Sequence, residues 1–186
     1  MKDTHEVYAV KVAGVKRNLR LNEVKPGLRI AILNILGDTK LVEASAKALA
    51  KKFKAQKLKY DALVTAEAKS IPLVHALSVV TKKPYVILRK SYKGYMGEAV
   101  KTETLSITTG APQTLYLDEK DRNLIDGKKV ILVDDVISTG STLQGMRMLM
   151  DAAGATVVGE SAIFTEGERA QWENVIALGH LPLFTS

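Results

Sequence analysis

The sequence predicts an α/β protein whose strands form a parallel sheet. Short apolar runs alternate along the chain with amphipathic helical segments, which is the pattern of βαβ units. The run 130–133, Val-Ile-Leu-Val, has no polar alternation, as expected for a strand buried on both faces. Two adjacent acids, Asp134 and Asp135, follow it directly. Because ligands of such sheets bind beyond the carboxyl ends of the strands, this pair marks a candidate site.

Each element of this fold is predicted from local periodicity and from turn residues. The helical segments carry apolar residues three and four positions apart, with lysines on the opposite face. Gly110, Ala111 and Pro112 separate two β-prone runs, which indicates a hairpin that could act as a flap. We expect strands over 7–12 and 29–36, a helix over 39–53, a strand over 61–66, a helix over 71–80, a strand over 84–88, a hairpin over 106–116, a strand over 130–133, a helix from about 141 to Gly154, and a strand over 156–164.

Length and composition favour one domain of an ordinary globular protein. The 186 residues are 46% hydrophobic and 25% charged. We expect a single domain over 1–186, with a core at about 37–165 and the segments 1–36 and 166–186 forming a small hood. No apolar run approaches the roughly 20 residues of a membrane span, and the first residues lack a signal-peptide core. Together with the absence of cysteine, this favours a cytoplasmic location without membrane partners.

The net charge of +7 leaves two classes of partner open. A basic chain can bind nucleic acid, but a small polyanionic substrate explains the charge equally well. Aromatic residues make up only 5%, with no stacking motif for single strands. The basic side chains that we expect to be solvated are Lys47, Lys51, Lys52, Lys54, Lys57 and Lys59 of the first helix, together with Lys16, Arg17 and Arg20.

A short loop of small residues after the acids is suited to a phosphate group. Ser138–Thr142 offer hydroxyls and backbone N–H groups, and Gly140 permits a backbone conformation closed to other residues. The free N–H groups and the positive dipole end of the following helix favour an anion. Adjacent strand residues point to opposite sides, so the two acids have different roles. The simpler alternative, a capped turn beside two solvated aspartates, explains this combination less well.

This segment resembles the phosphoribosyl pyrophosphate (PRPP) signature of the type I phosphoribosyltransferases. The resemblance implies a parallel-sheet core, with Asp134 and Asp135 on the ribose hydroxyls and also bound, through water, to Mg²⁺. The same signature occurs in PRPP sensors and PRPP synthases. The resemblance implies that PRPP is bound by Val136, Ile137, Ser138, Thr139, Gly140, Ser141 and Thr142, with the 5′-phosphate on Ser138–Thr142.

A second loop, Glu67-Ala68-Lys69-Ser70, follows the strand at 61–66. By position it lies beside the first loop, and from spacing alone a surface turn capped by Ser70 is an equal alternative. The loop resembles the pyrophosphate loop of adenine phosphoribosyltransferases, where Glu-Ala-Arg-Gly is usual. Ala68, Lys69 and Ser70 are then pyrophosphate ligands, although lysine lacks the bidentate fork of arginine. Because this family often has a cis peptide here, we expect one at Ala68–Lys69.

The segment from Arg89 to Glu98 places three cations and two glycines after the next strand. A solvated basic loop is the alternative to a closing flap that neutralises pyrophosphate. The resemblance to the catalytic loop of adenine-type enzymes implies that Arg89, Lys90 and Lys93 bind pyrophosphate, and that Glu98 assists proton transfer. Hypoxanthine–guanine enzymes usually have an aspartate at the position of Ser138, so the serine favours the adenine-type branch.

The sequence therefore predicts a purine phosphoribosyltransferase, with catalytic residues Lys69, Glu98, Asp134 and Asp135. The resemblance implies that adenine and PRPP give AMP and pyrophosphate, with Mg²⁺ as cofactor and a homodimer as assembly. The alternatives are a transferase for xanthine, guanine or hypoxanthine, and a PRPP-sensing regulator that binds nucleic acid. No DNA-binding module precedes the core, so nucleic acid is the less favoured partner. His75 and His180 are expected to be structural.

Overall fold

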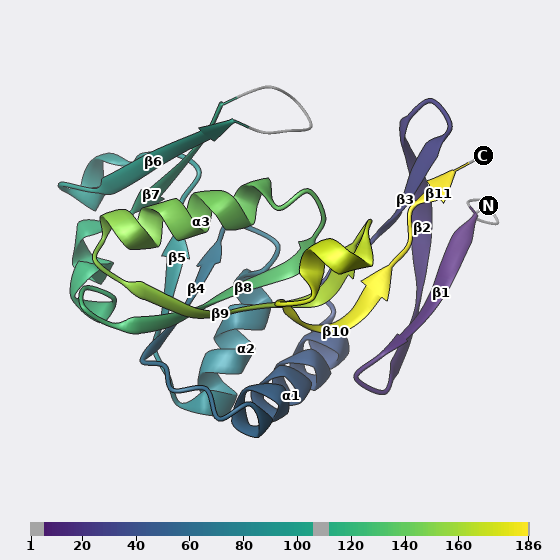
Figure 1. Cartoon of the computed structure of the whole chain (residues 1–186), viewed down its shortest axis with the longest axis horizontal. Helices are drawn as coiled ribbons and strands as arrows, with labels where there is room; N and C mark the ends of the chain where they lie inside the picture. Colours follow the sequence, from purple (N-terminus) through teal and green to yellow (C-terminus); the bar gives the residue numbers. More distant parts are fainter. Residues whose placement is uncertain (1–5, 106–111, 186) are drawn as a thin grey trace.

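A five-stranded parallel sheet forms the centre of the molecule (Figure 1). The structure, a computed structural model, describes residues 6–105 and 112–185. Every neighbouring pair in the sheet is parallel, which confirms the predicted fold class. In spatial order the strands are β10 (Ile176–Leu181), β9 (Thr156–Glu166), β8 (Lys129–Ile137), β4 (Ala62–Ala66) and β5 (Tyr85–Leu88).

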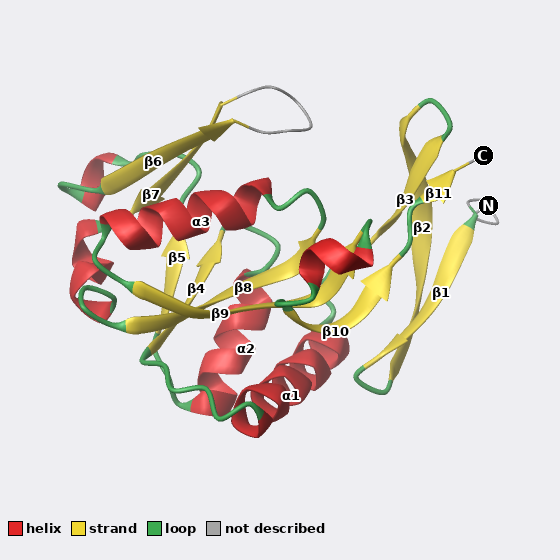
Figure 2. Cartoon of the chain, in the orientation of Figure 1, coloured by secondary structure: helices red, strands yellow, loops and turns green. Residues whose placement is uncertain are grey.

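Helices cover both faces of this sheet (Figure 2). On one face α1 (Thr39–Ala55) and α2 (Ile71–Thr81) pack over Leu63, Ile131 and Val133. On the other face α3 (Ser141–Ala152) packs over Val64, Val130 and Leu132. The strands β4 and β8 are therefore buried on both sides, which explains their continuous apolar runs. The helices predicted over 39–53 and 71–80 are confirmed to within two residues at each end.

A four-stranded antiparallel sheet stands beside the core (Figure 1). Its strands are β1 (Val7–Val12), β2 (Val15–Lys25), β3 (Leu28–Ile32) and β11 (Phe184–Thr185). The sequence analysis missed β2, because its buried residues Val15 and Leu19 are separated by basic ones. Arg17, expected to be solvated, instead makes two 2.6 Å hydrogen bonds to Asp38, the N-cap residue of α1. This ion pair ties the four-stranded sheet to the core.

The C-terminal part of the chain divides between the two sheets. The expectation that 166–186 belong to a hood is wrong for β10, which pairs with β9 in the core sheet. Only β11 joins the four-stranded sheet, through β3. The run Ile-Ala-Leu-Gly-His-Leu is a short, partly buried strand, a pattern that periodicity alone does not distinguish from other packing segments. The strand predicted over 29–36 also ends earlier, at Ile32, and the chain then continues without regular structure.

A two-stranded hairpin crosses α3 on the side away from the sheet. It consists of β6 (Val100–Leu105) and β7 (Pro112–Leu117). The hairpin predicted over 106–116 therefore begins six residues later than the observed first strand, and residues 106–111 lie outside the described part of the chain. Thr102 and Thr104 of β6 lie over Gly145 of α3. Among the residues that the structure describes there are also three short 3₁₀ helices, η1 (Gly94–Met96), η2 (Glu119–Leu124) and η3 (Arg169–Trp172).

Within residues 6–105 and 112–185, no helix is both long and apolar enough to cross a membrane.

Gly179 provides a test of the β9–β10 pairing. It lies opposite Phe164, and a Cβ atom at position 179 would come within 2.6 Å of the Phe164 ring. Gly179→Ala should therefore lower the free energy of unfolding by about 1–3 kcal/mol, the usual cost of overpacking. Gly94→Ala is the matched control, since a Cβ there meets nothing within 4 Å. Urea unfolding of both variants measures the difference, and equal midpoints would contradict the pairing.

Candidate functional site

The two acids lie on β8 itself rather than after it. The strand runs from Lys129 to Ile137, so Asp134 and Asp135 are its sixth and seventh residues. Asp135 is buried, with 7% of its surface exposed, and Asp134 is half-buried. Because β4 is the neighbour of β8, the loop that follows β4 lies directly beside them. The parallel topology thus brings the two predicted loops together.

Ser70 links the loop after β4 to both acids. Its hydroxyl lies 2.7 Å from Asp134 Oδ1 and 3.1 Å from Asp135 Oδ1, and it accepts a hydrogen bond from the Asp135 backbone N–H at 3.0 Å. The same N–H also lies 2.8 Å from Asp134 Oδ1. Ser70 is the N-cap residue of α2, but its side chain does not cap that helix. The alternative of a surface turn capped by Ser70 is therefore wrong, because the hydroxyl is directed to the acids.

The environment of Asp134 favours its protonated form. Burial removes water from the carboxyl group, and the Asp135 carboxylate adds like-charge repulsion. These two effects outweigh the hydrogen bond from Ser70 and raise the pKa of Asp134 to about 7. A ligand that brings cations or hydroxyl donors to this pair relieves both penalties.

The loop from Ser138 to Thr142 forms the turn between β8 and α3. Gly140 is the N-cap residue of α3 and has φ +77°, in the left-handed region that favours glycine. The Trp172 ring covers it, because a Cβ at position 140 would lie 2.8 Å from that ring. Gly140 makes no side-chain capping bond to α3, so this residue leaves the first N–H groups of the helix to an anion. The predicted phosphate cradle requires this geometry.

Two adjoining cavities contain most of the predicted site residues. The first, of about 190 Å³, brings together the loop after β4, Lys90 and the acids; it is lined by Ala66, Glu67, Ala68, Lys69, Ser70, Lys90, Asp134, Asp135, Val136 and Thr142. The second, of about 40 Å³, is lined by Asp134 and by the residues from Val136 to Leu143. Asp134, Val136 and Thr142 line both cavities, so a single ligand can extend through the two.

The structure does not bring the predicted flap cations together as expected. Arg89 lies in a separate cavity of about 470 Å³ outside β5, where its Nε donates to Glu67 Oε2 at 2.6 Å. Lys93 lines neither of the two cavities at the acids. Only Lys90 does so. The segment is also anchored rather than free, because Met96 is fully buried and the Arg89 backbone pairs in both directions with Tyr116.

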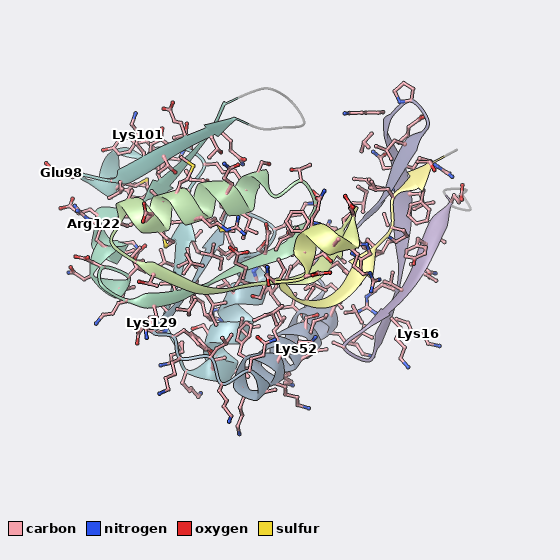
Figure 3. The ribbon with its side chains drawn as sticks, viewed as in Figure 1. Lys16, Lys52, Glu98, Lys101, Arg122 and Lys129 are labelled. Atoms are coloured by element: carbon pink, nitrogen blue, oxygen red, sulfur yellow. The ribbon has the colours of Figure 1, made fainter. Side chains whose placement is uncertain are left out.

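Glu98 lies far from the acids. Figure 3 places it at the end of the hairpin opposite the loop that joins β8 to α3. The seven residues from Glu98 to Thr104, which packs on α3, span about 20 Å in extended conformation. The expectation that Glu98 assists at the reacting base is therefore not supported by its position in this structure. The reason is that the strand of the flap begins at Val100 and carries the chain away from Glu98.

The cis peptide occurs one bond earlier than predicted. It joins Glu67 to Ala68, not Ala68 to Lys69. Glu67 N donates to Leu88 O at 2.9 Å, so the pairing with the neighbouring strand continues up to Glu67 and the chain turns directly after it.

Two residues of the site carried no role in the sequence analysis. Glu67 holds the strand ends in place, because Oε1 accepts the Lys90 N–H at 2.6 Å while Oε2 binds Arg89. The sequence signal that could have identified Glu67 is its position in the loop motif Glu67-Ala68-Lys69-Ser70. Trp172, whose Nε1 donates to Glu166 O at 2.9 Å, lies over Gly140. It is the single tryptophan of the chain, but its distance in sequence from the loop hid this contact.

The donor set at the acids fits a magnesium ion that is bound together with a phosphate ligand. In the described part of the chain, no group of three or more His, Cys, Asp and Glu residues could hold a metal by itself. Mg²⁺ is commonly held by one or two carboxylates, with waters and substrate phosphates completing its shell. Asp134 and Asp135 provide the carboxylates, and the two cavities leave room for the phosphates.

The fold and the site together define an α/β protein with two adjoining polar cavities at the carboxyl edge of its sheet. Comparison with known proteins gives the family. Residues 33–175, well over half of the chain, match the model of the phosphoribosyl transferase domain. The chain belongs to this family, which confirms the resemblance found in the sequence.

The curated relatives include transferases and one regulator. Residues of this chain are 37% identical over 114 positions to a hypoxanthine/guanine phosphoribosyltransferase of Methanothrix thermoacetophila, covering 61% of this chain and 56% of the relative. The purine biosynthesis transcriptional repressor PurR of Bacillus subtilis is 30% identical over 136 residues, covering 73% of this chain and 46% of the repressor. The chain thus spans about half the length of the curated relatives it matches.

Solved structures of the same fold include adenine phosphoribosyltransferases. That of Thermoanaerobacter pseudethanolicus superimposes with a TM-score of 0.67 at 20% identity, covering 94% of this chain and 95% of its own. That of Trypanosoma brucei, solved with AMP, pyrophosphate and ribose-5-phosphate, gives a TM-score of 0.66 at 22% identity over 82% and 70% of the two chains. At these identities the likeness supports the fold.

The raised pKa of Asp134 predicts a stability effect with a definite sign. Between the pKa of an unfolded aspartate and about 7, the folded protein binds more protons than the unfolded one, so stability falls as pH rises through this window. Asp134→Asn removes that decline. In magnesium-free buffer, the melting temperature of Asp134→Asn minus that of the wild type should therefore increase between pH 5 and pH 8. A constant difference across this range, measured by differential scanning calorimetry, would contradict the assignment.

Proposed function

We propose that this protein is a purine phosphoribosyltransferase, which converts a purine base and PRPP into a nucleoside monophosphate and pyrophosphate. The observation that carries the proposal is the pair of adjoining cavities that share Asp134. One holds an acid pair beside a cationic loop, and the other is the phosphate cradle. PRPP has a pyrophosphate, a ribose and a 5′-phosphate in this order. Family membership and the transferases among the relatives support the same function.

Each part of the substrate has a place in this geometry. The ribose hydroxyls donate to Asp134 and Asp135, and the 5′-phosphate accepts hydrogen bonds from the N–H groups at the start of α3. The pyrophosphate lies between Lys69 and Lys90, both exposed in the first cavity. When bound there, Mg²⁺ would neutralise pyrophosphate charge, with Asp134 and Asp135 as its protein ligands.

The reaction breaks the bond between C1′ and the pyrophosphate oxygen and forms a bond between C1′ and N9 of the base. The bonding electrons leave with pyrophosphate, and the N9 proton of the base is released to water. Lys69 and Lys90 stabilise the departing charge, while the carboxylates hold the ribose as C1′ becomes positive. Positioning of the base against C1′ supplies the remaining advantage. Homodimer formation, expected from the family resemblance, belongs to this proposal as well.

The choice of base within the purines is a finer part of the proposal. The adenine-type loop and Ser138 favour adenine, as the sequence analysis predicts. The curated relatives at 37–39% identity are instead hypoxanthine/guanine enzymes, which favours 6-oxopurines. We place hypoxanthine and guanine first, because these relatives are 37–39% identical over the matched residues, whereas the adenine enzymes of the same fold are about 20% identical.

A panel of purine bases tests both the transferase activity and the choice of base. Adenine, hypoxanthine, guanine and xanthine are each incubated with the protein, PRPP and Mg²⁺, and pyrophosphate release is measured. We expect release that requires both PRPP and one purine, with hypoxanthine or guanine fastest. Release with adenine alone would overturn the finer assignment and keep the coarser one. No release with any purine, by a protein that is shown to be folded, would overturn the transferase proposal.

Substitutions at Lys69 and at Glu98 test whether the geometry of the structure or the family resemblance identifies the catalytic residues correctly. Lys69→Gln should lower kcat/KM for PRPP by about tenfold to a hundredfold, because it removes a charge beside the departing pyrophosphate. Glu98→Gln, at the remote end of the hairpin, should change it by no more than about twofold. Initial rates at varied PRPP concentration measure both effects. A large loss in Glu98→Gln would restore the role that the resemblance gives to this residue.

A second candidate function, a PRPP-binding regulator of nucleic acid, is favoured by the match to the repressor of B. subtilis. The exposed lysines of α1, including Lys52, provide a basic face on the side of the sheet opposite α3 (Figure 3). A mobility-shift assay with double-stranded DNA, with and without PRPP, tests it. A PRPP-dependent shift combined with no turnover of any purine would favour the regulator over the transferase.

A further inference from the structure

A serine hydroxyl occupies the boundary between the two halves of the candidate site. Ser70 is 2% exposed and lies between the loop after β4 and the acids on β8. Its three polar contacts are Asp134 Oδ1 at 2.7 Å, Asp135 Oδ1 at 3.1 Å and Asp135 N at 3.0 Å. Serine is a favoured N-cap residue, but this side chain forms no capping bond with its own helix. Its contacts are all with the acids.

The Ser70 hydroxyl has a single proton, so it can donate a hydrogen bond to only one of the two carboxylates. A hydroxyl donates one hydrogen bond and accepts up to two. The Asp135 N–H supplies the bond that Ser70 accepts, so the single proton is donated to a carboxylate, and the shorter distance identifies Asp134. Ser70 therefore holds the Asp134 carboxylate in one orientation, 64 residues away along the chain.

The Ser70 hydroxyl connects the loop after β4 to the acids on the neighbouring strand β8. Ser70 is also adjacent to Lys69, which lines the same cavity. A movement of the loop at 67–70 would therefore change the position of Asp134 through the Ser70 side chain.

We propose that Ser70 is a positioning residue whose hydroxyl orients Asp134 for the ribose hydroxyls of PRPP and joins the loop at 67–70 to the acids. The proposal rests on the proposed function, because it assigns the ribose to the acids and the pyrophosphate to the loop. It makes a specific claim about which part of the ligand depends on Ser70. Ligands that carry a ribose should depend on the hydroxyl, and inorganic pyrophosphate should not.

The test measures binding by isothermal titration calorimetry, with and without Mg²⁺, for PRPP, ribose 5-phosphate and inorganic pyrophosphate. Ser70→Ala and Ser70→Gly should each weaken the binding of PRPP and of ribose 5-phosphate by about tenfold or more, and leave that of pyrophosphate unchanged. Ser70→Thr keeps the hydroxyl and should restore most of the affinity. Ser78→Ala is the matched control: it lies on the same helix, and its hydroxyl donates to Lys83 O at 2.6 Å, away from the acids.

Three outcomes would overturn the role of Ser70. These are unchanged affinity for ribose 5-phosphate in Ser70→Ala and Ser70→Gly, an equal loss for pyrophosphate, or an equal loss in Ser78→Ala. Because the measurement is of binding, it does not depend on turnover. A wild-type protein that binds PRPP but transfers it to no purine would overturn the transferase proposal alone. A wild-type protein that binds neither PRPP nor ribose 5-phosphate would overturn both.

Discussion

Two adjacent carboxylates at the end of a doubly covered strand are the constraint on which the site depends. A sheet buried on both faces excludes water from Asp135 and from most of Asp134, and charged groups in such a place are costly unless they are hydrogen-bonded. The Ser70 hydroxyl and the Asp135 backbone N–H satisfy part of this requirement. The remaining capacity of the carboxylates is directed into the cavities, where a ligand can use it.

The parallel order of the strands places the other polar groups of the site beside the acids. Because β4 lies beside β8, the loop after β4 meets the acids, and because β5 lies beside β4, Lys90 reaches the same cavity. Glu67 fixes this arrangement by binding the backbone of Lys90 and the side chain of Arg89. Residues from three separated stretches of chain therefore share one small volume. A shift of any one strand would disperse them, so the buried apolar pairing of the strands determines the geometry of the polar groups.

Sequence reading recovered the parts that depend on local pattern and failed where long-range contacts decide. The apolar runs at 61–66 and 130–133 identified central strands, and the signature after Val133 identified the loops that lie beside each other. The strand β2 was missed, because Arg17 looks like a surface residue until its contact with Asp38 is known. Arg89 and Glu98 were assigned by motif, but the path of the chain turns Arg89 to Glu67 and carries Glu98 to the far end of the hairpin. Spacing along the chain cannot report such directions.

The same arrangement that favours binding also limits the stability of the free protein. Like-charge repulsion and burial raise the pKa of Asp134, so the site without ligand contains a pair that resists full ionisation. Cations and ribose hydroxyls remove this penalty, and a ligand that binds only the folded state adds to stability in proportion to its affinity. The serine at position 70 moderates the cost without cancelling it, since its one proton serves one carboxylate. Replacing the acids by neutral residues would therefore raise stability, and under the proposed function it would remove the groups that bind the cation and the ribose.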